Sequence, residues 1–237
     1  MSPQRAARPP APGFPLTDRM AEPGSIEWAL STTRTVRRRL DLERPVDSAV
    51  VRDCLELALQ APTGGDLQGW RWIVITDPAV RAAVRDIYVD ALNEASGGRR
   101  PSQVADSGNR MLEGAWHLAT HLAEVPVLVV ACIRGRLAPE TAPARAASLY
   151  GSIYPAVWSL QLALRSRGLA SAMTTVHLER HTEMAHLLGI PDDVTQAALI
   201  PIAHLVGDDL HPAHRRPVGE VAYLDHWGDP WEVGTGD

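Results

Sequence analysis

The chain has 237 residues, enough for one domain with a sizeable core, and 45% of them are hydrophobic. Its net charge of −5 argues against a general nucleic-acid or membrane-surface binder, and its apolar runs fall well short of the roughly 20 residues that span a bilayer. The two cysteines, Cys54 and Cys132, lie in apolar runs, so we expect buried thiols and a cytoplasmic location rather than a disulfide.

The first 24 residues differ in composition from the rest of the chain. They hold six of the nineteen prolines, show little periodicity and lack the apolar stretch of a signal peptide. We therefore expect a flexible N-terminal arm at 1–24, a folded domain at 25–206 and a C-terminal tail at 207–237.

A run of arginines follows a short amphipathic helix expected at 25–33. If the run at 33–39 is also helical, Arg34, Arg37 and Arg38 share one face. Three guanidinium groups and the Thr35 hydroxyl suit a phosphate monoester in an otherwise acidic protein. A solvated run of charge is the alternative.

A loop rich in glycine and proline spans 61–69, between an amphipathic helix that begins at Asp47 or Ser48 and a strand at 72–76. Its glycines let the backbone approach a flat or anionic ligand closely, although an ordinary tight turn has the same composition. Hydrogen-bonding side chains on this loop suit the edge of a heterocycle: Thr63, Asp66 and Gln68.

Helices and strands alternate through the rest of the domain, without a visible repeat. The pattern predicts an α+β or α/β domain built on one sheet. We expect helices at 78–95, 110–124, 144–167 and 179–188, and strands at 125–133, 170–176 and 196–206.

Three histidines, His177, His181 and His186, resemble a metal cluster in their spacing. The stretch reads His-Leu-Glu-Arg-His, however, and a zinc protease requires glutamate directly after its first histidine. Spacing places no carboxylate ligand beside them, so we expect surface or capping histidines and no metal site.

Five stretches, in this order along residues 25–231, resemble the nitroreductase family of FMN-dependent oxidoreductases. Each motif alone is weak, but their shared order is specific. The stretches are Thr-Thr-Arg-Thr-Val-Arg-Arg-Arg-Leu at 32–40, Ala-Pro-Thr-Gly-Gly-Asp-Leu-Gln-Gly-Trp at 61–70, Gly-Leu-Ala-Ser-Ala-Met-Thr-Thr at 168–175, Leu-Gly-Ile-Pro at 188–191, and Arg-Arg-Pro-Val at 215–218 with Trp227.

The resemblance implies an α+β, three-layer fold with a central mixed sheet, and an intertwined homodimer that holds two FMN molecules at its interface. It implies that Arg34, Thr35, Arg37 and Arg38 contact the phosphate and ribityl chain, and that Arg215 or Arg216 returns to the phosphate. It further implies cofactor contacts from Pro62, Thr63, Gly64, Asp66 and Gln68, with Thr63 and Gln68 beside the isoalloxazine ring, and from Met173, Thr174 and Thr175 along the flavin.

Two positions depart from the family pattern. The family often has arginine where this chain has Thr33, and Arg38 is the expected replacement. The family commonly has asparagine where this chain has Asp66. Asp66 either completes a turn, places a carboxylate beside the flavin or is protonated and donates a hydrogen bond.

The expected activity is that of an FMN-dependent oxidoreductase which takes electrons from NADH or NADPH and reduces a small planar acceptor such as a nitroaromatic or quinone. Since the cofactor carries the redox chemistry, no catalytic acid or base is predicted. A flavin-dependent oxidase or desaturase of a specialised metabolite and a non-catalytic flavin-binding protein are the alternatives. The expected partners are a second copy of the chain and a small-molecule substrate, with neither nucleic acid nor membrane.

Overall fold

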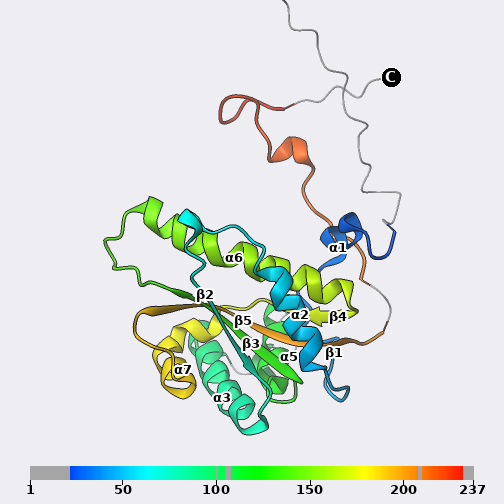
Figure 1. Ribbon diagram of the computed structural model, residues 1–237. Helices are drawn as coiled ribbons and strands as arrows, with labels where there is room; N and C mark the ends of the chain where they lie inside the picture. The colour runs from blue at the N-terminus through cyan, green and yellow to red at the C-terminus, as the bar shows by residue number, and fades with distance from the viewer. Residues whose placement is uncertain (1–21, 100, 105–107, 208–209, 232–237) are drawn as a thin grey trace, which may run out of the picture.

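The structure is a computed structural model that describes residues 22–99, 101–104, 108–207 and 210–231. Nearly all of the predicted N-terminal arm lies outside these residues. A five-stranded sheet forms the centre of the domain, and helices cover both of its faces (Figure 1). The strands are β1 (Leu40–Asp41), β2 (Trp70–Ile75), β3 (Val127–Arg134), β4 (Leu169–Ser171) and β5 (Val194–Leu205).

The strand order is β1-β5-β3-β2, and β4 also pairs with β5. All of these pairs are antiparallel. Among the described residues, the parallel component of the sheet is a single bridge between Thr35 and Ser171. The predicted α+β fold is confirmed, but the expected mixed sheet is antiparallel in every pair of its strands.

Two hydrophobic cores separate the three layers. On one face, α2 (Ser48–Ala58) and α6 (Pro143–Ser166) pack onto the sheet, and on the other lie α3 (Pro78–Ala95), α5 (Arg110–His121) and α7 (His181–Leu188) (Figure 1). Side chains of β3 alternate between the two cores because successive residues of a strand point to opposite faces. A strand buried on both faces reads as a continuous apolar run, which is why β3 and β5 are recognisable in the sequence.

Helix ends follow the capping residues of the sequence. Asp47 accepts a hydrogen bond from Ala49 N at the start of α2, and Asp77 accepts one from Val80 N at the start of α3. Gly168 follows α6 with a φ of +73°. The remaining helices are α1 (Ile26–Thr32) and α4 (Pro101–Val104), with 3-10 turns at Gly64–Asp66, Val176–Arg180 and Val218–Glu220.

The arginine run is not helical, so the predicted sharing of a helix face is wrong. α1 ends at Thr32, and the next residue, Thr33, has an extended ψ of 125°. Thr35 then pairs with Ser171, and Val36 N donates to Ser171 O over 3.0 Å. Tertiary pairing and burial of the Val36 side chain therefore decide the conformation here, rather than local helix propensity.

The strand predicted at 170–176 is shorter than expected. β4 ends at Ser171, and a second, isolated bridge joins Thr174 to Leu199. Thr175 then turns the chain, with φ −120° and ψ 3°, into the 3-10 turn that precedes α7. The predicted helix at 179–188 accordingly begins as α7 at residue 181.

Both cysteines are buried free thiols, as predicted. Burial raises the pKa of the Cys132 thiol to about 12, so it stays protonated. Within the described residues, no helix is both long and apolar enough to cross a bilayer.

Candidate functional site

An arginine-lined cavity of about 420 Å³ opens between the segment that follows α1 and the start of α5. Arg37 lies directly against α5, because its Cδ is 3.6 Å from where a Cβ on Gly114 would stand. Glycine at 114 therefore leaves room for the guanidinium arm. The residues around this arginine cavity are Arg34, Thr35, Val36, Arg37, Arg38, Arg39, Arg110, Gly114, Leu210 and His211.

The arginines of the cavity are not equivalent. Arg38 forms an ion pair with Glu113 at 2.9 Å, and Arg39 Nε donates to Val206 O over 2.8 Å. Arg34, Arg37 and Arg110 have no ion-pair partner in the part of the chain that the structure describes. Three unpaired cations around one cavity concentrate positive potential there, which favours an anionic ligand.

The segment 173–175 lies beside the arginine run, since Thr35 and Val36 both bond the neighbouring Ser171. Its side chains alternate: Met173 and Thr175 are exposed, while Thr174 is buried. The Thr174 hydroxyl lies 2.8 Å from the hydroxyl of Tyr88 on α3. Of this predicted group, only Met173 and Thr175 therefore present side chains at the surface.

The loop at 62–68 is held by α6. Gly64 N donates to Ser152 Oγ over 2.9 Å, and a Cβ at Gly64 would stand 2.3 Å from Ser148 Oγ. The next residue, Gly65, has a φ of +60°. Two of the loop's glycines are thus required, one by close approach to a helix and the other by a left-handed backbone.

Asp66 and Gln68 bond each other at the exposed tip of this loop. Gln68 Nε2 donates to Asp66 Oδ1 over 2.9 Å, and Gln68 N donates to Thr63 Oγ1 over 3.2 Å. Both Asp66 (φ +54°) and Gln68 (φ +46°) have left-handed backbones, which are uncommon for residues other than glycine. Pro62 is exposed at the start of the loop.

One copy of the chain does not bring the loop to the arginine cavity. The loop is bonded to Ser152 of α6, whereas Thr32, two residues before Arg34, accepts a hydrogen bond from Arg165 of the same helix. Thirteen residues separate these two attachment points, which is about 20 Å along the helix. Figure 1 likewise shows α1 toward the C-terminal end of α6. The predicted cofactor residues thus form two separate groups.

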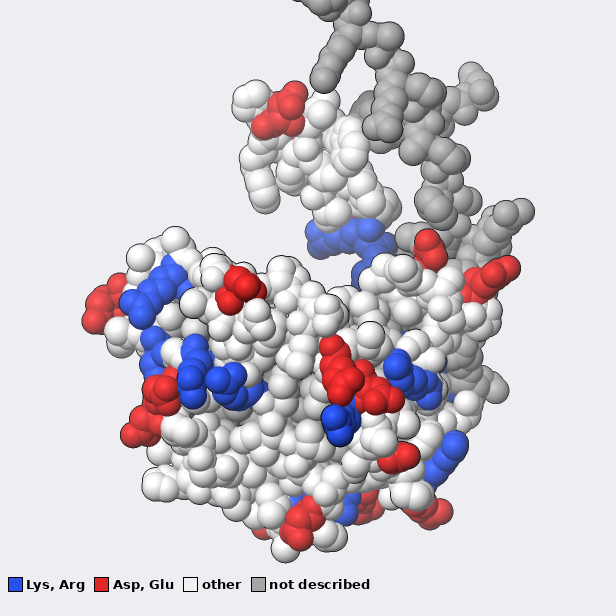
Figure 2. Space-filling model, in the orientation of Figure 1, with Lys and Arg blue, Asp and Glu red and all other residues white. Residues whose placement is uncertain are grey.

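Residues near the start of the tail line the cavity, but the arginines of the tail do not. Leu210 and His211 line the cavity, while Arg215 and Arg216 are exposed and lie outside its lining. Arg215 donates to the neighbouring His214 O over 3.2 Å. Figures 1 and 2 show the described part of the tail standing off the body, with a hollow between them.

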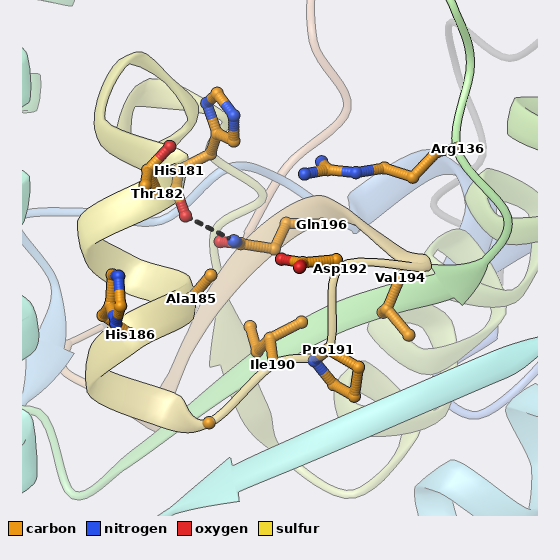
Figure 3. Close-up of a pocket in the computed structure, with 11 residues that line it drawn as sticks. Arg136, His181, Thr182, Ala185, His186, Ile190, Pro191, Asp192, Val194 and Gln196 are labelled. Atoms are coloured by element: carbon orange, nitrogen blue, oxygen red, sulfur yellow. Dashed lines mark hydrogen bonds between the residues drawn. The ribbon is translucent and has the colours of Figure 1, made fainter.

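A second cavity, of about 210 Å³, lies between α7 and the start of β5 (Figure 3). Arg136 reaches over it, and Gln196 Nε2 donates to His181 O at its wall over 2.7 Å. None of the residues predicted to bind the cofactor lines it. We therefore assign the candidate site to the arginine cavity, which is larger and carries the unpaired positive charge.

The three histidines considered as metal ligands do not form such a group, and no cluster of three or more candidate ligands occurs among the described residues. His177 is fully buried, with no hydrogen-bond partner for either ring nitrogen in the described structure. His181 lies over the 3-10 turn with Nδ1 3.1 Å from Leu178 O.

Sequence reasoning missed several residues of the site or its support. Arg110 and His211 line the cavity, Glu113 pairs with Arg38, and Tyr88 bonds Thr174. Arg110 carried one usable signal, since it follows Asn109, whose side chain caps α5. The others are distant in sequence from the motifs that they support.

Comparison with known proteins agrees with this fold. The sequence model of the nitroreductase family matches residues 30–204. A Thermus thermophilus protein described as NADH dehydrogenase is 30% identical over 199 residues, which cover 79% of this chain and 90% of that protein. Iodotyrosine deiodinase of Drosophila melanogaster is 27% identical over 161 residues, 67% of this chain but only 55% of that protein.

A solved structure has a similar fold. The FMN and NADPH-dependent nitroreductase NfnB from Sphigopyxis sp. strain HMH superposes with a TM-score of 0.62 at 21% identity, covering 84% of this chain and 98% of that one. The family match covers most of the domain, and this chain shares its fold with NfnB. The chain belongs to the nitroreductase family.

Proposed function

We propose that this protein is an FMN-dependent oxidoreductase that takes electrons from NADH or NADPH and reduces a small planar acceptor such as a nitroaromatic or quinone. The observation that carries the proposal is the group of three unpaired guanidiniums, Arg34, Arg37 and Arg110, around one cavity beside the 173–175 segment. The described function of NfnB, which depends on FMN and NADPH, supports the choice of cofactor and donor.

The residues of the arginine cavity fit the phosphate end of FMN. A phosphate monoester has up to two negative charges and several acceptor oxygens, which match the forked donors of Arg34, Arg37 and Arg110. Thr35, which is exposed beside them, adds a hydroxyl donor. Arg38 forms an ion pair with Glu113, so it adds to the positive potential of the cavity rather than binding the phosphate directly.

FMN supplies the redox chemistry when bound, and the chain supplies binding and orientation. The backbone at 173–175 is fixed on one side by Leu199 and lies beside the arginine run through Ser171, so it offers a rigid edge for the ring. The exposed Met173 side chain adds an apolar contact.

We further propose that the protein is a homodimer in which the 62–68 loop of one copy completes the site of the other. Separation of the two groups of predicted residues in one copy supports this arrangement. Apolar side chains left uncovered support it as well, since Leu67 at the loop tip is 81% exposed and Trp158 on α6 is 42% exposed. A cytoplasmic location, where thiols stay reduced, fits the two free cysteines.

A flavin-dependent oxidase is the second candidate, and Asp66 is the observation that favours it. Its carboxylate sits on the loop assigned to the ring, where negative charge opposes flavin reduction and favours passing electrons on to oxygen.

Anaerobic mixing of the purified protein with NADPH separates the candidates. The proposed reductase bleaches the visible flavin absorbance rapidly, and an added nitroaromatic or quinone restores it. Bound FMN that NADPH does not bleach would exclude the reductase. Reduction by a metabolite followed by reoxidation with oxygen would then identify an oxidase, and no turnover with any donor would leave a flavin-binding protein.

A further inference from the structure

Tyr88 of α3 is almost completely buried, at 1% exposure, and its hydroxyl reaches across to the segment assigned to the flavin. The hydroxyl lies 2.8 Å from Thr174 Oγ1. Burial raises the pKa of the Tyr88 phenol, while the hydrogen bond to Thr174 and the positive charge of Arg37 oppose that rise. Tyr88 therefore contacts, through Thr174, the 173–175 segment of the site that this chain supplies.

Thr174 is the point at which this segment is fixed. Its N–H donates to Leu199 O over 3.0 Å, and its carbonyl accepts from Leu199 N over 2.8 Å. Because Thr174 points inward, its neighbours Met173 and Thr175 point outward. If Thr174 moved toward or away from the core, the side chains of Met173 and Thr175 and the backbone between them would move with it.

The hydrogen bonds of the Thr174 hydroxyl show what Tyr88 adds. Besides Tyr88, the described partner of this hydroxyl is Val176 N, at 3.4 Å, which is a long hydrogen bond. A threonine hydroxyl has one proton to donate and two acceptor positions. Without the phenol, the buried hydroxyl of Thr174 would keep only the weaker partner, and the segment would lose its tie to α3.

We propose that Tyr88 is a positioning residue for the flavin, which acts through Thr174 to hold the Met173–Thr175 edge at a fixed depth beside the ring. The inference rests on the proposed FMN-dependent function. Tyr88 does not touch the cofactor in this arrangement. Its hydroxyl sets the position of the residues that do.

The test compares Tyr88→Phe with the wild type in the full-length protein. The substitution retains the buried ring and removes only the hydroxyl. We expect the Kd for FMN to rise about three- to ten-fold, the effect of one neutral hydrogen bond. We also expect a changed visible circular dichroism spectrum of the bound flavin and a shifted midpoint potential.

Tyr154→Phe is the matched control. Tyr154 is a half-buried tyrosine of α6 whose hydroxyl donates to Ala197 O over 3.2 Å, on the opposite face of the sheet. Its loss should lower Tm without changing the flavin spectrum or potential. If Tyr88→Phe behaves in the same way, with a lower Tm and an unchanged flavin, Tyr88 is merely structural and the inference is overturned.

A double-mutant comparison tests the route through Thr174. In a Thr174→Val background, Tyr88→Phe should have no further effect on the potential or the spectrum, because the hydrogen bond is already absent. Full additivity would overturn the proposed route. If Tyr88→Phe does not fold, Thr174→Val against Thr174→Ser supplies the same contrast, with the wild-type flavin properties expected only in the serine variant.

Failure of this inference is distinguishable from failure of the proposed function. A wild-type protein that binds no added FMN overturns both. A wild-type protein that binds FMN, together with a Tyr88→Phe variant of unchanged flavin spectrum, potential and affinity, overturns the inference alone.

Discussion

Arg37 lines the arginine cavity, with its side chain against Gly114 and no ion-pair partner within the described structure. We expect Arg37→Ala to weaken FMN binding by roughly 1.5–3 kcal/mol, the usual contribution of a hydrogen bond to a charged group. Fluorescence titration of the apoprotein with FMN measures this loss. Arg52→Ala, which removes a highly exposed arginine on α2, is the control and should leave the affinity unchanged. Equal affinity in both variants would remove the phosphate role of Arg37.

Asp66 makes a turn contact and also carries a charge, and the two roles are separable. Asparagine at this position keeps the oxygen that accepts from Gln68 Nε2 but removes the charge. If the carboxylate faces the flavin, Asp66→Asn raises the midpoint potential at neutral pH, because reduction then adds negative charge without a nearby anion to oppose it. Equal potentials from pH 5 to 9 would leave Asp66 with the turn alone.

The buried His177 makes the free energy of unfolding depend on pH. Burial lowers its pKa from 6.5 to about 4, so the unfolded chain binds a proton first as the pH falls. Stability is therefore lost between about pH 6.5 and pH 4, by an amount near 3 kcal/mol for this single group. Denaturant unfolding at pH 7 and at pH 4 measures this loss in the free energy of unfolding. The loss should be smaller in His177→Leu than in the wild type, by about the same amount. The control His214→Gln, at an exposed position, should lose as much unfolding free energy as the wild type. A His177→Leu variant that also loses as much as the wild type would refute the assignment.

The residue types of the site were predictable from the sequence, but their geometry was not. The arginines, the glycine-rich loop and Met173 are local signals. Arg110 and Tyr88 join the site only through packing of α5 and α3. The Asn109 cap marks a helix start at Arg110, but no local signal places either residue at the site. The inward orientation of Thr174 likewise depends on its pairing with Leu199, 25 residues later in the chain.

At the scale of elements, α6 holds the 62–68 loop through one buried serine. Ser152 Oγ accepts from Gly64 N and donates to Ser148 O over 2.7 Å, and Ser152 O accepts from Trp70 Nε1 over 2.8 Å. Ser152→Ala leaves Gly64 N–H without its partner, so we expect a loss of about 1–3 kcal/mol in the free energy of unfolding.

Ser166→Ala provides the comparison, because Ser166 Oγ, at the C-terminal end of α6, donates to Ala163 O and accepts only from the exposed Arg167 side chain, so it holds no loop. Denaturant unfolding of both variants should show the larger loss for Ser152→Ala. Equal losses would mean that the Gly64 contact does not stabilise the loop.

Elements with strong local signals were predicted nearly to the residue. α3 has Asp77 and Pro78 at its start, and β3 is an unbroken apolar run. The arginine run was considered as a possible helix, and that possibility is wrong, because the sequence does not show that Ser171 offers it a pairing partner. The strand after Gly168 was predicted too long for a related reason. Thr174 pairs with Leu199 and bonds Tyr88, and the chain turns at Thr175, and these tertiary contacts leave no local signal in the sequence.

At the scale of the whole molecule, the two halves of the proposed site lie apart in one copy of the chain, and the tail stands off the body. The tail carries uncovered apolar side chains of its own, including Trp227 at 89% exposure, which packs against Tyr223 with ring centroids 4.9 Å apart. A second copy of the chain that covers the tail, the 62–68 loop and α6 would bury these surfaces and join the two halves. Cutting the chain after Pro217 should therefore weaken the dimer and the cofactor site together.

Native mass spectrometry of the purified full-length protein, incubated with FMN and compared with the chain cut after Pro217, tests this most directly. We predict two chains with two FMN molecules for the full-length protein, and a larger share of monomer with less FMN for the shortened one. A full-length monomer that carries FMN, or a dimer that takes up none, would contradict the proposed shared site.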